Sequence, residues 1–226
     1  MGGRLACISA LRDWGVFAAE APGPHVHLPH NHSRERSPRH PRVRLTAANR
    51  DGVKLHWRPL LRPGDATHRV GLVDALRQAL LCQPAPLAIA SIDSALFRRM
   101  LHPEDMDVLF AGPAAVRALR PLVDGRSESG QESVLRCAFD SAGLSFEIQV
   151  SIAGVGRVDF LVEGRLVVEA DSRLAHSSWE QELRDRDRDL ALARLGIPTL
   201  RPHYRVIMSD PTSVVAAVVA VLARLR

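Results

Sequence analysis

The stretch Arg157-Val158-Asp159-Phe160-Leu161-Val162-Glu163-Gly164-Arg165-Leu166-Val167-Val168-Glu169-Ala170-Asp171 decides the fold of the C-terminal half. Two largely apolar runs flank Glu163-Gly164, which is typical of a β-hairpin. Because side chains alternate along a strand, Glu169 and Asp171 point to one face. If Gly164 is the middle of a three-residue loop, Asp159 lies opposite Glu169 on that face. The hairpin therefore predicts two or three carboxylates on one patch.

Such a patch favours a bound cation, because like charges opposed across a sheet are destabilising. Carboxylate oxygens suit a hard divalent ion, and Mg²⁺ or Mn²⁺ can generate a hydroxide nucleophile and stabilise charge on a phosphate. We therefore consider a metal site at Asp159 and Glu169, assisted by Asp171. The alternative is that these acids face solvent or pair with Arg157 and Arg173. The spacing leaves both interpretations open.

The elements around the hairpin occur in the order α-β-β-β-α-β-α, which predicts an α/β sandwich with a mixed sheet. Apolar periodicity, a glycine after the last turn and a proline at a first helical position indicate the helices. The other expected elements are helices over residues 129–142 and 178–195, a helix that opens at Asp210-Pro211, and strands over residues 146–152 and 197–200.

The N-terminal half reads as a smaller α+β region. We place the domain boundary at the polar, glycine-containing stretch 124–130, so that residues 1–124 precede a domain of residues 125–226. The elements expected in the first part are a helix from Leu5 to Trp14, strands over residues 42–45 and 53–57, a mobile loop from His30 to Arg44, and helices between residues 66 and 122.

Charge is unevenly distributed along the chain. The 30 Lys and Arg residues exceed the 25 Asp and Glu residues by five, and Lys54 is the only lysine. Residues 1–63 hold eleven basic and four acidic residues, against nineteen and twenty-one from Gly64 onward. The basic loop with Arg34 and Arg36 fits contact with a polyanion such as DNA, and equally a solvated arm that binds nothing.

Composition and motifs exclude several classes of protein. No apolar run reaches the roughly 18 residues of a membrane span, and no secretory signal is evident, so we expect a cytoplasmic protein without a membrane partner. The three cysteines are widely separated and form no CxxC pair. The run His25-Val26-His27-Leu28-Pro29-His30-Asn31-His32 could bind Zn²⁺ or Ni²⁺, but a strand that enters the basic loop is our default interpretation.

Three further groups of residues are candidates, each with an ordinary alternative. Glu132 fits a capping box with Ser129. His176 could protonate a leaving group or position a water, or it is simply solvated. The alternating run 184–189 is typical of a solvated helix face, although Arg184 and Arg188 lie one turn apart and could reach DNA phosphates.

Several of these motifs occur in a recognisable order: Asp159-x9-Glu169-x-Asp171, then His176, then Asp185-Arg186-x-Arg188-Asp189, and a strand after Gly196. This order resembles the domains related to very-short-patch-repair endonucleases, which belong to the PD-(D/E)XK nuclease superfamily and have a restriction-endonuclease-like fold. The resemblance covers about residues 126–226. It implies that Glu132 joins Asp159, Glu169 and Asp171 in the active site, with Gln149 a weaker candidate. Asp171 stands at the place of the superfamily's lysine.

The N-terminal half carries Gly3-Arg4-Leu5-Ala6-Cys7-Ile8-Ser9-Ala10-Leu11 and Ile92-Asp93-Ser94-Ala95-Leu96. These runs loosely resemble the region beside such domains in proteins similar to AbiEi-type antitoxins of type IV toxin–antitoxin systems. The combined expectation is a bacterial, DNA-acting protein with a Mg²⁺-dependent endonuclease-like domain. The alternative is a non-catalytic DNA-binding regulator or antitoxin, which would have a toxin as its partner.

Overall fold

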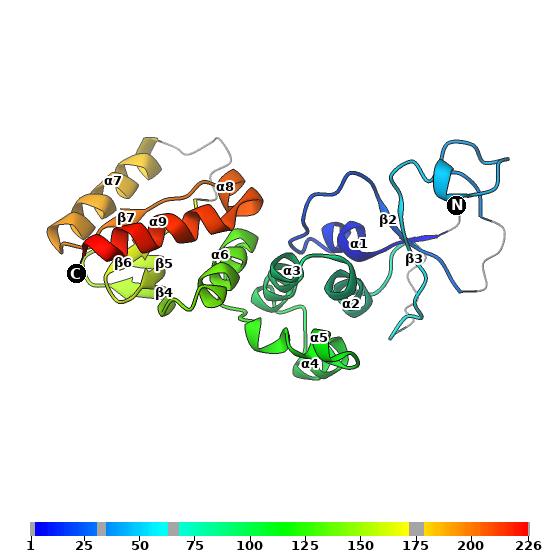
Figure 1. Ribbon diagram of the computed structural model, residues 1–226, viewed down its shortest axis with the longest axis horizontal. Helices are drawn as coiled ribbons and strands as arrows, with labels where there is room; N and C mark the ends of the chain where they lie inside the picture. The colour runs from blue at the N-terminus through cyan, green and yellow to red at the C-terminus, as the bar shows by residue number, and fades with distance from the viewer. Residues whose placement is uncertain (1–2, 31–34, 63–67, 172–178, 226) are drawn as a thin grey trace. The chain divides into compact units, whose positions relative to one another are not determined.

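The computed structural model describes residues 3–30, 35–62, 68–171 and 179–225 (Figure 1). The chain divides into two compact units, Met1–Val123 and Asp124–Arg226. This division lies one residue before the boundary proposed from the sequence. Both units combine helices with a mixed sheet, so the chain is of the mixed α/β class. Among the described residues, no helix is both long and apolar enough to cross a bilayer.

Unit 1 begins with a small sheet of very short strands. β1 (Arg4–Leu5) pairs antiparallel with β2 (His25–His27), which pairs parallel with β3 (Lys54–His56). The helix α1 (Cys7–Asp13) leaves the sheet after β1 and packs on α2 (Leu72–Cys82). The remaining elements are α3 (Ala85–Phe97), α4 (Pro103–Phe110), α5 (Ala114–Arg117) and the 3-10 turns Ala47–Asn49 and Arg120–Leu122.

Unit 1 confirms the strands expected near His25 and at residues 53–57 but differs elsewhere. The first helix starts at Cys7 rather than Leu5, because the Leu5 N–H donates to the His68 carbonyl at 2.7 Å. The strand expected at residues 42–45 is not formed. The chain turns there, with the Val43 N–H bonded to the His40 carbonyl, and only Arg44 bridges back to Arg36.

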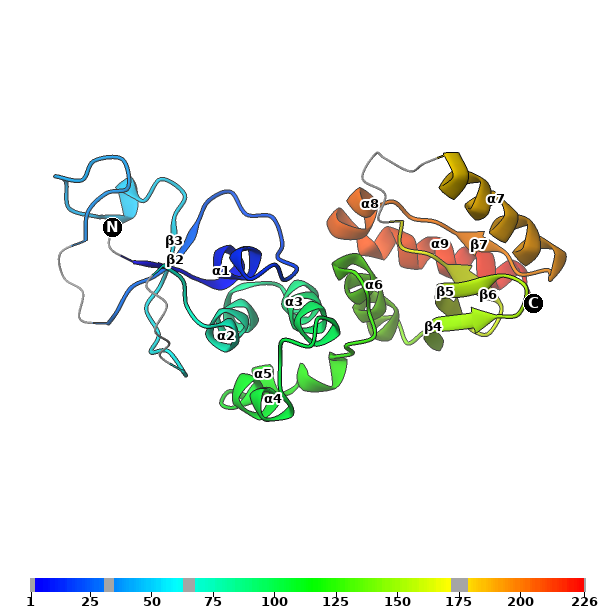
Figure 2. The ribbon, with the colours of Figure 1, turned by 180° about the vertical axis from the view of Figure 1, so that it is seen from behind.

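Unit 2 contains one mixed sheet with the strand order β4-β5-β6-β7. The first two pairings are antiparallel and the third, between β6 and β7, is parallel. The helix α9 lies in front of this sheet in Figure 1 and behind it in Figure 2. In chain order the elements are α6 (Gly130–Ser141), β4 (Phe146–Ile152), β5 (Gly156–Val162), β6 (Leu166–Val168), α7 (Trp179–Arg194), β7 (Thr199–Leu200), α8 (Tyr204–Ser209) and α9 (Pro211–Arg224).

The core of unit 2 forms where helices meet the sheet. Phe139 of α6 packs edge-on against Phe160 of β5, with ring centroids 5.3 Å apart, and both rings are buried. The helices α6, α8 and α9 pack on one another. Leu192 of α7 is buried against Val158 and Val167. These contacts fix β5, which carries Asp159, and β6, which Glu169 directly follows.

Two details of unit 2 depart from expectation. The strand β6 ends at Val168 rather than Asp171. The Glu169 N–H bonds to the Leu200 carbonyl of β7, and the Ala170 N–H bonds to the Asp159 side chain instead of to a β5 carbonyl. The helix α8 was not expected. It begins after His203, whose ring Nδ1 accepts a hydrogen bond from the Val206 N–H and caps the first turn.

Candidate functional site

The register of the β5–β6 hairpin is the one expected from a three-residue loop centred on Gly164. Val162 pairs with Leu166 and Phe160 with Val168, so Asp159 lies opposite Glu169 at the next position. On the other side of β5, Asp159 faces Gln149 of β4, which lies between the pairs Ile148–Phe160 and Val150–Val158. Gln149 of β4, Asp159 of β5 and Glu169, the first residue after β6, therefore form a row across the sheet.

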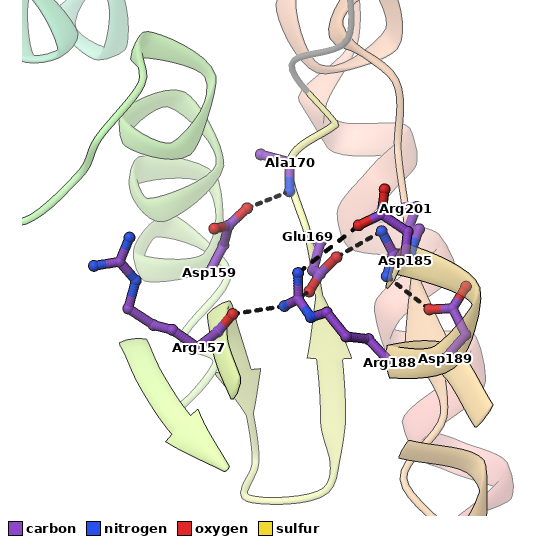
Figure 3. Close-up of polar contacts among 8 residues, drawn as sticks. All are labelled: Arg157, Asp159, Glu169, Ala170, Asp185, Arg188, Asp189 and Arg201. Carbon is purple, nitrogen blue, oxygen red and sulfur yellow. Dashed lines mark hydrogen bonds and ion pairs between the residues drawn. The ribbon is translucent and has the colours of Figure 1, made fainter. Parts of the chain in front are cut away.

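Asp159 occupies the middle of this row. Its Oδ2 accepts a hydrogen bond from the Ala170 N–H at 2.8 Å (Figure 3). Burial raises the pKa of Asp159 to about 7, and the negative charges of Glu132 and Glu169 act in the same direction. The Ala170 N–H and Arg188 oppose this rise. A carboxyl group whose pKa is raised by burial and by other acids is typical of functional sites.

Glu132 reaches the row from helix α6. The Ser129 hydroxyl accepts a hydrogen bond from the Glu132 N–H at 3.3 Å, which is one half of the expected capping box. The Glu132 carboxylate does not complete the box. Its Oε2 accepts from the Glu128 N–H at 2.9 Å and from Gln149 Nε2 at 2.8 Å. Burial raises the pKa of this carboxyl group, so Glu132 both supports the helix start and faces β4.

Gln149 is in an unusual backbone conformation for a strand residue. Its φ is +55°, a left-handed value that non-glycine residues seldom adopt and that often marks a functional site. Its Nε2 donates to Glu132, whereas its buried Oε1 has no hydrogen-bond partner in the described part of the chain. The site therefore contains one buried oxygen without a donor.

Glu169 is held by two arginines. Arg188 Nη2 lies 2.6 Å from Glu169 Oε1, and Arg201 Nη1 lies 2.7 Å from Oε2 (Figure 3). Arg188 also donates to the Arg157 carbonyl at 2.6 Å. The side chain of Arg157 pairs with Glu128 at 2.5 Å, so it is not the partner that the sequence suggested for these acids.

The structure says less about the remaining candidate residues of unit 2. Asp171 is half-buried, and its backbone forms a parallel bridge with His203, beyond the end of β7. His176 and Arg173 lie outside the described residues. In the part of unit 2 that the structure describes, no three His, Cys, Asp or Glu side chains are grouped closely enough to share a metal ion. Glu132, Asp159 and Glu169 are thus electrostatic neighbours that do not converge on one point.

The candidate DNA-contacting residues differ in exposure. Arg184 is exposed on α7, whereas Arg188 is half-buried and forms an ion pair with Glu169. Arg34 lies outside the described residues, and Arg36 is exposed. The Leu45 N–H bonds to the Glu35 carbonyl and the Ser37 N–H to the Val43 carbonyl, which closes the loop at its base. The exposed arginines of this loop are Arg36, Arg39, Arg42 and Arg44.

Comparison with known proteins gives two relatives. They are the uncharacterized proteins MT2308 and Rv2248 from two strains of Mycobacterium tuberculosis, each 35% identical to this chain over 123 residues. The match covers 49% of this chain and 45% of each relative, so the chain spans less than half the length of these relatives. No protein-family model and no solved structure matches the chain.

Arg201 is the site residue that the sequence analysis missed. It follows β7, whose Leu200 pairs in parallel with Val168 of β6, so Arg201 stands next to Glu169. Parallel pairing of the strand after a long helix with the acidic strand is the signal that could have located it.

Proposed function

We propose that unit 2 is a metal-dependent phosphodiesterase that hydrolyses DNA and has a restriction-endonuclease-like arrangement. The observation that carries this proposal is the charge neighbourhood of Asp159, whose pKa is raised to about 7 by burial and by Glu132 and Glu169. The order α6-β4-β5-β6-α7-β7 and the mixed sheet support it, since they agree with the domains that the sequence resembles.

The side chains of the site suit a hard divalent cation. Mg²⁺ and Mn²⁺ prefer oxygen ligands, and the row offers carboxylate and amide oxygens. Asp159 uses only Oδ2 in a hydrogen bond within the described part of the chain, and the buried Gln149 Oε1 lacks a donor there. Both are oxygens of the type that such a cation prefers. Glu169 has each carboxylate oxygen on an arginine, so it would exchange one of them for the ion.

Each residue has a distinct part in this proposal. Asp159 and Glu169 would hold the ion and Asp171 would assist, while Glu132, oriented by its bond from Gln149, would position a water molecule. When bound, Mg²⁺ supplies an activated hydroxide and stabilises the charge that develops on the phosphate. Arg184, exposed on α7, is a candidate for phosphate contact.

The test is cleavage of DNA by the full chain. With Mg²⁺ or Mn²⁺ we expect nicking of supercoiled plasmid and cutting of linear duplex, and a chelator should stop both. Asp159→Asn should lower the rate about 100-fold or more, since an active-site ion contributes several kcal/mol to transition-state stabilisation. Asp187→Asn is the matched control, because Asp187 is an exposed acid of α7 in the same unit. Wild-type protein that leaves varied DNA intact with both ions would refute the proposal.

One observation favours a second function. The ion pairs of Glu169 with Arg188 and Arg201 neutralise it without a metal. A nuclease-like fold whose Glu169 is already paired with arginines would serve as the scaffold of a DNA-binding regulator or antitoxin, with a toxin as partner. The same assay separates the two functions, because the regulator binds DNA but does not cleave it.

Both functions require contact with DNA, for which we propose the basic loop. Replacing Arg42 and Arg44 together with Gln should reduce the slope of log Kd against log salt concentration by about two, if each arginine contacts one phosphate. Binding measured between low and moderate salt gives this slope. Arg165→Gln, which changes an exposed arginine of unit 2, should leave it unchanged. An unaltered slope in the double variant would place the contacts elsewhere, with Arg184 the next residue to test.

A further inference from the structure

Two cysteines and two histidines of unit 1 meet from four different elements. Cys7 begins α1, His25 lies on β2, His56 on β3, and Cys82 ends α2. Their potential ligand atoms all lie within 4.8 Å of one another. His25 Nδ1 is 3.1 Å from His56 Nε2, with the two ring centroids 5.2 Å apart. Of the histidines that the sequence analysis considered for zinc or nickel, His25 belongs to this cluster, His27 and His30 do not, and His32 lies outside the described residues.

The separations in the cluster match those of a tetrahedral zinc site. Zn–S bonds are about 2.3 Å and Zn–N bonds about 2.0–2.1 Å, so neighbouring ligand atoms stand roughly 3.3–3.8 Å apart. The two histidine nitrogens are 3.1 Å apart, and no two of the four ligand atoms are more than 4.8 Å apart, so the observed separations lie around this range. Two thiolates and two neutral imidazoles also balance the charge of one divalent ion.

The cluster is largely shielded from solvent. Cys7 and His25 are buried, and His56 and Cys82 are half-buried. Because two adjacent thiolates repel each other, a divalent cation between the two sulfur atoms would compensate both charges.

Cys7 is held in a strained position that faces this cluster. Its φ is +46°, in the left-handed region that non-glycine residues seldom occupy, and such strain is often found where a ligand is bound. Gln78 of α2 holds the residue, because the Cys7 N–H donates to Gln78 Oε1 at 2.8 Å. A cavity of about 400 Å³ lined by Gln78, His56 and Cys82 leads to the cluster and provides an entry path.

We propose that Cys7, His25, His56 and Cys82 bind one Zn²⁺ ion and that this ion stabilises the fold of unit 1. Thiolates and imidazoles favour zinc over the hard ions that carboxylates bind. Four protein ligands leave no open position, which is typical of a structural rather than a catalytic site. The ion would join α1 and α2 to strands β2 and β3, which are three residues long and share a small apolar core. This proposal is independent of the function of unit 2.

The test is the zinc content of the full chain purified with a reductant. We expect about one zinc per chain, and tetrahedral cobalt absorption with a thiolate charge-transfer band after exchange with Co²⁺. Cys82→Ser and His56→Asn should each lower the bound zinc at least tenfold. Cys137→Ala is the matched control, because Cys137 is the cysteine of α6 in the other unit and should not affect zinc content.

The wild-type chain also provides a test that does not depend on the folding of a variant. Removing the metal with a strong chelator should lower the melting temperature of the reduced protein, and added zinc should restore it. The proposal is overturned if reduced, folded protein binds neither Zn²⁺ nor Co²⁺, or if Cys137→Ala loses as much zinc as Cys82→Ser. A disulfide between Cys7 and Cys82 in protein purified with a reductant would overturn it too.

Discussion

Replacing Asp159 with Asn is expected to stabilise the protein at pH 8 by up to about 4 kcal/mol, although it removes metal-dependent cleavage. Asp159 is mostly buried, and its pKa rises from 3.8 in the unfolded chain to about 7 in the folded one. Asn removes the charge that is unfavourable there. It retains a side-chain oxygen that can accept the hydrogen bond from the Ala170 N–H.

The direction of the pH dependence follows from proton binding. Between about pH 4 and pH 7 the folded chain keeps a proton on Asp159 that the unfolded chain has lost, so stability falls as the pH rises through this window. Below the window both states are protonated and the residue has no effect on the pH dependence. Glu132, whose pKa is also raised by burial, adds a change in the same direction.

Denaturant unfolding of both proteins from pH 4 to pH 8 measures this effect. The wild type should lose stability steadily, and the Asp159→Asn variant should lose much less. Mn²⁺ at pH 8 should then stabilise the wild type but not the variant, because the bound ion compensates the buried negative charge of Asp159. Parallel stability curves for the two proteins would show that Asp159 titrates normally. The electrostatic argument for the site would then fail.

The sequence predicts unit 2 well because its signals are local. The alternating run that became β4 has the expected bounds, Phe146–Ile152, and the Glu163-Gly164 turn sets the register of β5 and β6. Strand alternation and turn length depend only on neighbouring residues. Whether this sheet belongs to the restriction-endonuclease-like class remains part of the proposal.

Unit 1 is harder to predict, since its sheet depends on distant contacts. β1 has two residues, and Leu5 joins a strand only because it bonds to His68 and pairs with Val26. The zinc-ligand candidates are equally dispersed, in the order Cys7-x17-His25-x30-His56-x25-Cys82. No short spacing motif marks such a set, so only the folded chain brings it together.

The acidic site of unit 2 is predictable from the sequence only in part. The position of Asp159 opposite Glu169 follows from the hairpin. The bond between Gln149 and Glu132 depends on how α6 packs, and the arginines of Glu169 come from α7 and the end of β7. Charge patterning favoured a solvated helix face for Arg188, with phosphate contact as the alternative. In the structure Arg188 forms an ion pair with the buried Glu169. Partners from separate elements are therefore what single-sequence reasoning misses.

Glu169→Gln is expected to lower the free energy of unfolding by about 2–3 kcal/mol. The change leaves the guanidinium groups of Arg188 and Arg201 without their shared buried carboxylate, and removing one partner of such a pair is costly. The expected loss is below that of a fully buried pair, because 29% and 25% of the two arginine side chains remain exposed. Thermal or denaturant unfolding without added metal measures it.

Asp189→Asn is the matched control, since Asp189 pairs with the same Arg201 at 2.6 Å but is 47% exposed, and its loss should cost less than about 1 kcal/mol. Equal stability of the two variants would mean that the arginine pairs of Glu169 contribute no more than the exposed pair of Asp189. If Glu169→Gln is the less stable variant and wild-type protein cuts DNA only with metal, the Glu169 carboxylate both pairs with the two arginines and binds the ion. If the same loss accompanies wild-type protein that never cuts, Glu169 is a structural acid, and the regulator becomes the function to pursue.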